Sequence, residues 1–514
     1  MDKARNRHTG LRSFAWLLAL SLLLLAAASW LESSALWRHP LSWLATLDQA
    51  GALLVLTAAA TVVAGLLAIL ITVVAIVVQL AATRYTHRVT SLFVRDRVNV
   101  AVMTLFVLTT ALCISLAVVL SGKDAETRVV PHAGLLLAMG LALGCVVALV
   151  PYFAYVFGFV SPLSVIQRIK AAAMQEVENA RSGSVDADKH AVIRSVEDLE
   201  DVARGAMNSY DRGIAMAAIE ALAALVVDVE RLRGTLPAAW FELDDAVAGD
   251  PDFVAMSGTA LDEVARERSW FEAKILRQYH ALFADAVGGA RDIASVIAIH
   301  TQRLVEQCGA DRPALVALCQ RAFNSYLRAA INGRDVRTAY YVLHQYRVLG
   351  ETLLERGADA GAVEVAGHLG SYGRIAAAAG VPFVLEVAAY DVAQLVERAA
   401  GRHEARDALL GLLLEIQPPD ARRLHGVCRA QVQLATFFLA ANTPEPARRI
   451  ADRLAGEPPE LLAAVRRDIE REDSPHYHEI ENRGANFAYL PPERRAQLDA
   501  FYETMHLASR RSAT

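Results

Sequence analysis

The sequence lacks the residue patterns that identify most enzymes and metal proteins. It contains no GxxxxGK[ST] phosphate-binding loop, no HExxH zinc motif and no GxSxG nucleophile turn. Its five cysteines form no CxxC pair, so the sequence indicates neither a disulfide framework nor a zinc ribbon. The formal net charge of −5 argues against a dedicated nucleic-acid-binding protein. We therefore expect no enzymatic activity, no cofactor and no nucleic-acid partner.

Clustered metal ligands are also scarce. His476 and His478 are the weak candidates, because an x-His-x-His strand places both imidazoles on one face, as a zinc site requires. A third ligand at a suitable spacing is missing. Isolated pairs of this kind are mostly polar surface residues, and we predict no metal site.

Charged residues are absent from four long runs, and these runs are the strongest structural signal in the chain. One of them, residues 50–83, would form a helix about 50 Å long, which exceeds a hydrocarbon core of about 30 Å. We predict four membrane spans, at about residues 13–31, 51–81, 98–121 and 133–158. Because no charge lies inside a span, the usual signature of proton-coupled transport is missing.

The first run has two interpretations. Ala26–Ala28 resembles a cleavage region, so residues 13–31 could be a secretory signal. We favour a retained anchor, because the run is longer than a usual signal core and further spans follow it.

Basic residues predict how these spans are oriented. They cluster in the N-terminal tail, in the loop after the second run and at residues 168–170. The loop contributes Arg84, His87, Arg88, Arg95 and Arg97. By the positive-inside rule, the N-terminus, this loop and everything after residue 165 are cytoplasmic, with the spans in the cytoplasmic (inner) membrane. We expect the loop to contact anionic membrane lipids.

Small and weakly polar residues recur every three or four positions along the second run, so they share one face of the predicted helix. They are Thr57, Thr61, Gly65, Ala68, Thr72, Ala75 and Gln79. In lipid, such a face lets another helix backbone approach closely. We favour ordinary helix packing at this face; the alternative is that it lines a pore or the axis of a symmetric oligomer.

The rest of the chain shows helical patterns and lacks the alternating patterns of a sheet. We predict an all-α fold: a four-span transmembrane region followed by a cytosolic domain of helical hairpins, similar to a solenoid. The predicted division is 1–165 for the membrane domain, 166–310 and 311–472 for two helical subdomains, and 473–514 for a C-terminal loop and helix. We expect Phe487 and Tyr489 of that loop to dock onto the domain.

Two further patterns concern the helical part. Ala206–Arg212 and Ala322–Arg328 share an Asn-Ser-Tyr core, which we interpret as a faint internal repeat, although a chance match explains it nearly as well. Gly367, Gly370 and Gly373 are interpreted as marking a helix turn, because their spacing does not fit a nucleotide-binding loop.

Residues 79–85, Gln-Leu-Ala-Ala-Thr-Arg-Tyr, followed by Phe-Val-Arg-Asp-Arg at 93–97, resemble a family of uncharacterised bacterial membrane proteins known as a domain of unknown function. The resemblance covers roughly residues 45–170. It implies two N-terminal transmembrane hairpins and a cytosolic helical domain, and it implies no activity, substrate or catalytic residue. Ala81–Thr83 departs mildly from the small hydroxyl residues expected there.

These observations favour a membrane-anchored helical scaffold or sensor that binds a cytosolic protein partner. The alternative is a homo-oligomeric, channel-like protein with residues 50–83 lining the axis. We expect a homo-oligomer in either case.

Overall fold

The computed structural model describes residues 48–84, 97–121, 132–183, 189–309, 311–418, 424–476, 483–484 and 486–512. The predicted span at 13–31 lies outside these residues, as do His87, Arg88, Arg95 and His478. The chain divides into two compact units, Met1–Val165 and Ile166–Thr514.

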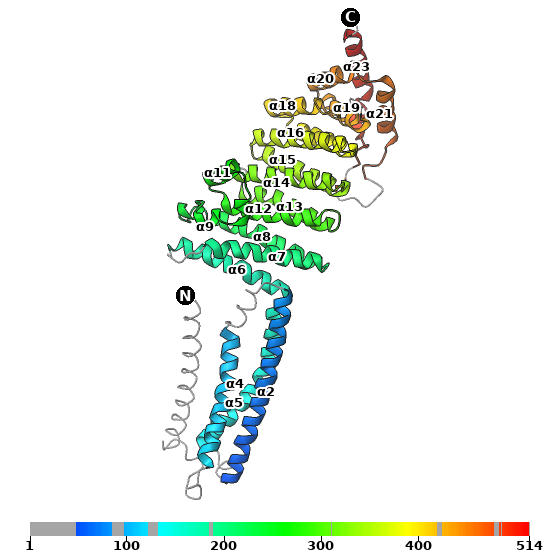
Figure 1. The fold of residues 1–514 in the computed structure, drawn as a ribbon. Coiled ribbons are helices and arrows are strands. Elements are labelled where there is room, and N and C mark those ends of the chain that lie inside the picture. Colours follow the sequence, from blue (N-terminus) through cyan, green and yellow to red (C-terminus); the bar gives the residue numbers. More distant parts are fainter. Residues whose placement is uncertain are drawn as a thin grey trace. The chain divides into compact units, whose positions relative to one another are not determined.

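Three long apolar helices form the described part of the first unit (Figure 1, blue to cyan). They are α2 (Gln49–Arg84), α4 (Arg97–Leu120) and α5 (His132–Val160), and they pack against one another. Each is long and apolar enough to cross a membrane. With 36 residues, α2 is about 54 Å long. These helices cover the residues of three of the four predicted spans.

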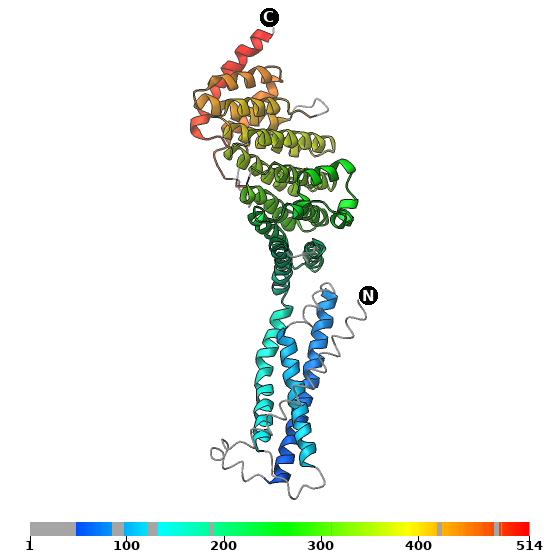
Figure 2. The same ribbon diagram turned by 90° about the vertical axis from the view of Figure 1, so that its left-hand side faces the viewer.

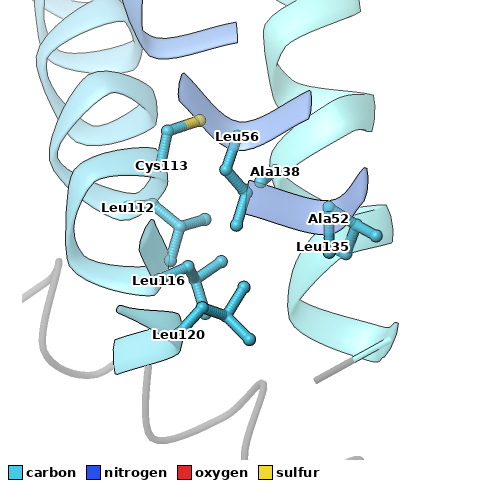
Figure 3. Packing of buried hydrophobic residues seen from close by; sticks show 8 residues of the cluster. All are labelled: Ala52, Leu56, Leu112, Cys113, Leu116, Leu120, Leu135 and Ala138. Atoms are coloured by element: carbon cyan, nitrogen blue, oxygen red, sulfur yellow. The ribbon is translucent and has the colours of Figure 1, made fainter. Parts of the chain in front are cut away.

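The core of the first unit lies along one side of α2. Ala52, Leu56, Val63 and Leu70 are buried there against α4 and α5. Figure 3 shows the cluster near the start of α2, where Leu56 and Cys113 meet. Apolar burial of this kind adds no hydrophobic driving force in lipid, so tight packing and hydrogen bonds hold such helices together.

Polar contacts join the three helices inside the apolar bundle. The Tyr152 hydroxyl of α5 donates a hydrogen bond to Asn99 Oδ1 of α4 at 2.6 Å. The Gln49 side-chain amide at the start of α2 donates to the carbonyl of Leu120 at 2.7 Å. Because buried polar groups in lipid need internal partners, these bonds fix how the helices align along their axes.

The second unit is a stack of helices in two layers (Figures 1 and 2). One layer consists of α7 (Lys189–Asn208), α12 (Trp270–Ala286), α14 (Pro313–Asn332), α16 (Asp359–Ala378), α18 (His403–Leu414) and α20 (Pro444–Leu454). The other consists of α8 (Arg212–Leu232), α13 (Arg291–Cys308), α15 (Val336–Glu355), α17 (Pro382–Arg398), α19 (His425–Ala440) and α21 (Pro459–Arg471). Each helix contacts its neighbours along its own layer, which is the arrangement of helical repeats.

Seven further elements lie in the described part of the chain. They are α6 (Pro162–Arg181), η4 (Ala238–Phe241), α9 (Asp245–Ala248), α10 (Pro251–Val254), α11 (Gly258–Arg266), α22 (Pro492–Arg495) and α23 (Leu498–Ser512). The described residues contain helices and turns but no strand. The predicted all-α fold is therefore confirmed.

Several turns of the stack repeat one backbone geometry. Tyr210 and Arg334 follow helix ends with φ of 59° and 50°, and the next residue donates its N–H to the carbonyl five residues earlier at 2.9 Å. This is the Schellman arrangement, which satisfies carbonyls that a helix end leaves unpaired. The residues after the turns, Asp211 and Asp335, cap α8 and α15 with their side chains.

The internal repeat proposed from the sequence is wrong in its alignment. Ala206–Arg212 contains the end of α7 and the turn, where Tyr210 is 88% exposed. Ala322–Arg328 lies inside α14, where Tyr326 is fully buried. The structural counterpart of Asp211 is instead Asp335, because both residues cap the helix that follows the same turn. Helix pairs do repeat, but their sequences do not repeat in that register.

The interpretation of the three glycines as turn residues is also wrong. Gly367, Gly370 and Gly373 all lie inside α16. At Gly373, a Cβ atom would lie 2.8 Å from Leu385 Cδ1 and 3.1 Å from Leu385 Cα. Glycine therefore allows α17 to approach α16 closely at this position.

Candidate functional site

The small-residue face of α2 lies on the surface of the first unit. Its seven residues, Thr57, Thr61, Gly65, Ala68, Thr72, Ala75 and Gln79, are all exposed. A Cβ atom on Gly65 would meet no atom within 4 Å. The close packing that we expected for this face is therefore not made by α4 or α5, which contact the opposite side of α2.

The threonines of this face already have hydrogen-bond partners. The hydroxyl groups of Thr57, Thr61 and Thr72 each donate to the carbonyl four residues earlier, at 2.8 Å. Such bonds satisfy the hydroxyl within its own helix, so the face needs no water in order to be stable in lipid.

A shallow groove of about 760 Å³ continues this face onto α4. Small side chains form much of its lining: Thr57, Ala60, Thr61 and Ala64 from α2, and Thr110 and Ala117 from α4. Small residues on two adjacent helices leave room for a further helix to approach.

The predicted basic loop and histidine pair remain predictions. Arg84 is the last residue of α2 and Arg97 the first of α4, and the residues between them lie outside the described part of the chain. His476 is exposed. Within the described residues, no group of three or more histidine, cysteine, aspartate or glutamate side chains is placed to hold a metal ion.

The sequence did not reveal a buried ion pair that fastens the C-terminal loop to the helical stack. Arg483 donates two hydrogen bonds to the Asp391 carboxylate of α17, both at 3.0 Å. It also donates to the carbonyl of Tyr340 of α15 at 2.8 Å, and its guanidinium lies 4.2 Å from the centre of the Tyr340 ring. The side chains of Arg483 and Asp391 are only 3% and 1% exposed.

Phe487 docks a short distance further along, as predicted. Its ring stacks on Tyr390 of α17 with centroids 4.5 Å apart. The Tyr390 hydroxyl and the Gln433 amide of α19 both donate to the Phe487 carbonyl, and Gln433 also donates to the Tyr489 carbonyl at 3.3 Å.

We refer to residues 483, 484 and 486–490 as the docked segment, and to the surface that receives them as the docking face. The docking face comprises Tyr340 and Arg347 of α15, Tyr390 and Asp391 of α17, and Gln433 of α19. These three helices are neighbours in one layer of the stack.

A second buried polar cluster lies between α8 and α12. Burial, and then a hydrogen bond with Glu230, raise the pKa of Glu272 to about 7, although the charge of Arg233 opposes the shift. For Glu230, burial is outweighed by hydrogen bonds from Glu272, Arg233 and Arg312, so its pKa lies below the ordinary value.

Comparison with known proteins agrees with the character of the first unit. Residues 10–233 match the family described as "Predicted membrane protein (DUF2254)". The DUF2254 match and the three candidate spans support a membrane location. The expected resemblance to a membrane-protein family of unknown function is confirmed at that level, while the loop motif at residues 79–97 stays untested. The DUF2254 match brings no activity with it.

Two other comparisons add little. Comparison with curated proteins finds no match. One solved structure, a "Circular tandem repeat protein with novel repeat topology and enhanced subunit contact surfaces", aligns over 90% of this chain and 98% of that chain, with 14% identity and a TM-score of 0.34. At that TM-score, the match supports no conclusion about this chain.

Proposed function

We propose that the protein is a membrane-anchored helical scaffold or sensor whose second unit binds a cytosolic protein partner. The observation that carries this proposal is the docking face, which holds an irregular segment through an ion pair, an aromatic stack and bonds to backbone carbonyls. Stacked helical pairs offer extended surfaces of this kind to binding partners. The missing enzyme motifs favour binding over catalysis.

The proposed location is the bacterial cytoplasmic membrane, with several spans and both termini in the cytoplasm. The distribution of basic residues supports this orientation. Reporter fusions after Tyr85 and Ser184 should report a cytoplasmic location, and a fusion at Lys123 an external one. A cytoplasmic signal at Lys123 would overturn the orientation.

We further propose that copies of the chain associate through the exposed small-residue face of α2. Its support is the absence of bulk on that face: the residues are exposed, and Gly65 has open space above it. A second copy can then approach at backbone distance, which is favourable in lipid.

A channel-like assembly with this face at its axis is the second candidate. The exposure of the whole face from Thr57 to Gln79 favours it. The hydrogen bonds of Thr57, Thr61 and Thr72 to their own helix favour packing instead, because these hydroxyls do not depend on water.

Thiol labelling separates the two candidates. Single cysteines replace Thr57, Gly65, Thr72 and Gln79, and each variant is treated in membranes with a water-soluble thiol reagent. A scaffold predicts labelling at the ends of α2 but not in the middle, because lipid and protein exclude water there. A reactive face along the whole helix would establish the channel. Leu54→Cys, which is 71% exposed on the first unit, shows the reactivity of a surface position outside the stripe.

The five native cysteines should contribute little background labelling in this experiment. Cys113, Cys145, Cys319 and Cys428 are buried. Burial and the nearby carboxylates of Glu230 and Glu272 raise the pKa of Cys308 to about 11, so little reactive thiolate exists at neutral pH.

The partner itself is tested by photo-crosslinking in intact cells. A photoreactive phenylalanine analogue replaces Phe383, which is 45% exposed and lies beside Tyr340 of the docking face. We expect an adduct of one discrete mass. The same analogue at Tyr210, which is exposed on a turn far from Tyr340 in sequence, is the control. Equal adducts at both positions, or none at Phe383, would count against a partner at this face.

A further inference from the structure

The docked segment is held at two points within a long connection. About 20 residues separate Arg471, the last residue of α21, from Pro492, the first of α22. Connections of this length in compact domains are uncommon and are usually functional or disordered. Here the interactions concentrate on the Arg483 guanidinium and on the Phe487 ring and carbonyl, in the way that a few anchor residues dominate a binding interface.

Two groups of the docking face, the Asp391 carboxylate and the Tyr390 hydroxyl, have a polar partner outside the docked segment. Arg347 Nε lies 3.2 Å from Asp391 Oδ1, so the buried carboxylate retains a neighbouring positive charge. Arg429 donates to the Tyr390 hydroxyl. An uncompensated buried charge would cost several kcal/mol, but the charge of Asp391 has this second partner. We therefore expect the docking face to remain folded when the docked segment leaves it.

We propose that the docking face is a binding site for a partner peptide that carries arginine and, four residues later, an aromatic residue. Arg483 and Phe487 occupy this site from within the chain, and the partner displaces them. This inference rests on the proposed scaffold function and specifies its partner. Asp391 binds the guanidinium of the peptide's arginine, Tyr390 stacks on the aromatic ring, and Gln433 binds the peptide backbone.

The geometry also predicts which basic residue is accepted. A planar guanidinium can donate two parallel hydrogen bonds to Asp391 and lie over the Tyr340 ring at the same time. A lysine ammonium cannot reproduce this arrangement. The site should therefore select arginine over lysine.

The test measures binding of a labelled peptide to the full chain in lipid nanodiscs. The probe is a fluorescein-labelled peptide with the sequence of residues 482–490, Asn-Arg-Gly-Ala-Asn-Phe-Ala-Tyr-Leu. Arg483→Ala/Phe487→Ala frees the docking face, and fluorescence anisotropy should show at least tenfold tighter binding to this variant than to the native chain. Adding Asp391→Asn, or using a peptide with lysine in place of arginine, should weaken binding at least tenfold. Equal binding by all these chains, or no binding to the freed face, overturns the proposal.

Hydrogen exchange on the native chain supplies a measurement that needs no substitution. Excess unlabelled peptide should speed exchange at the amides of Ala488 and Tyr489, which are held by Asn486 in the docked segment, and leave α17 protected. Unchanged exchange at saturating peptide overturns the proposal even if the double variant does not fold.

The scaffold function and the peptide-binding site can be rejected independently of each other. An adduct at Phe383 without peptide binding would retain the scaffold and reject this recognition chemistry. Peptide binding together with a water-reactive α2 would retain the site and reject the scaffold as the function of the membrane region.

Discussion

Glu230 of α8 and Glu272 of α12 place their carboxyl groups side by side, between the guanidinium groups of Arg233 and Arg312. Arg233 approaches Glu230 at 2.8 Å, and Arg312 approaches Glu272 at 3.2 Å. Glu272 is only 1% exposed. Two neighbouring buried carboxylates resist ionising together, so Glu272 retains its proton to a higher pH than an ordinary glutamate.

This arrangement predicts a loss of stability as pH rises. Because burial and Glu230 raise the pKa of Glu272 from 4.5 to about 7, the folded chain binds more protons than the unfolded chain between these values. The free energy of unfolding should therefore decrease as pH rises from about 4.5 to 7, by at most about 3 kcal/mol from this group. Glu272→Gln mimics the protonated acid and should flatten this dependence. Denaturant unfolding at several pH values checks it, and identical slopes for both chains would contradict it.

Gly373 and Gly367 of α16 should respond in opposite directions to alanine. At Gly373 a methyl group would collide with Leu385 of α17, so Gly373→Ala should destabilise the second unit by about 1 to 3 kcal/mol. At Gly367 no atom lies within 4 Å of the new Cβ. Gly367→Ala should instead stabilise the helix by about 0.5 to 1 kcal/mol. Shifts of the same sign in denaturant midpoint would show that α17 does not pack as described.

Removing Arg483 should cost more than removing an exposed arginine. Arg483→Ala leaves the buried Asp391 with Arg347 alone, and we expect a loss of about 2 to 4 kcal/mol, somewhat below the usual value for a broken buried pair. Arg231→Ala removes a pair with Asp228 in which the arginine is 73% exposed, and should change stability by less than about 1 kcal/mol. Thermal unfolding followed by circular dichroism measures both variants. A similar small effect for both would mean that the docked segment is weakly held.

Gly65→Leu tests the proposed contact between copies. The structure leaves open space above Gly65, so the first unit should remain folded. If a second copy packs there, the added bulk should weaken association by about 1 to 3 kcal/mol. Native mass spectrometry or in-membrane cross-linking reports the oligomer size. Leu54→Ile, at an exposed position outside the stripe, is the matched control, and an unchanged oligomer in Gly65→Leu would exclude this face as the contact.

The long uncharged runs were enough to locate α2, α4 and α5, because a span in lipid must avoid charge along its whole length. They did not show which side of α2 faces its neighbours. Leucine, valine and isoleucine surround that helix on the remaining sides, and lipid gives no polar contrast that would mark an inner face. The buried positions Leu56, Val63 and Leu70 therefore look like exposed Leu54 and Ile69 in sequence.

In the second unit, local patterns predicted helices but not their partners. Two of the repeating turns use Tyr210 and Arg334 at positive φ, where glycine would have been the recognisable signal. Phe487 was expected to dock because an aromatic side chain in a polar loop is stabilised by packing against the folded domain. The buried ion pair of the same segment joins Arg483 to Asp391, 92 positions away in the chain. No local sequence pattern indicates that two such distant residues pair.

The order of the docking face and the docked segment along the chain has a consequence for synthesis. The helices α15, α17 and α19 all precede Arg483, and contacts between neighbouring helices let such a stack form as it emerges. At a translation rate of about 5 to 20 residues per second, Arg483 is made about 2 to 9 seconds after α19 is complete. While Arg483 is still missing, a nascent chain in which these helices have stacked has a docking face without its own segment, so a partner bearing arginine and an aromatic residue meets no internal competitor.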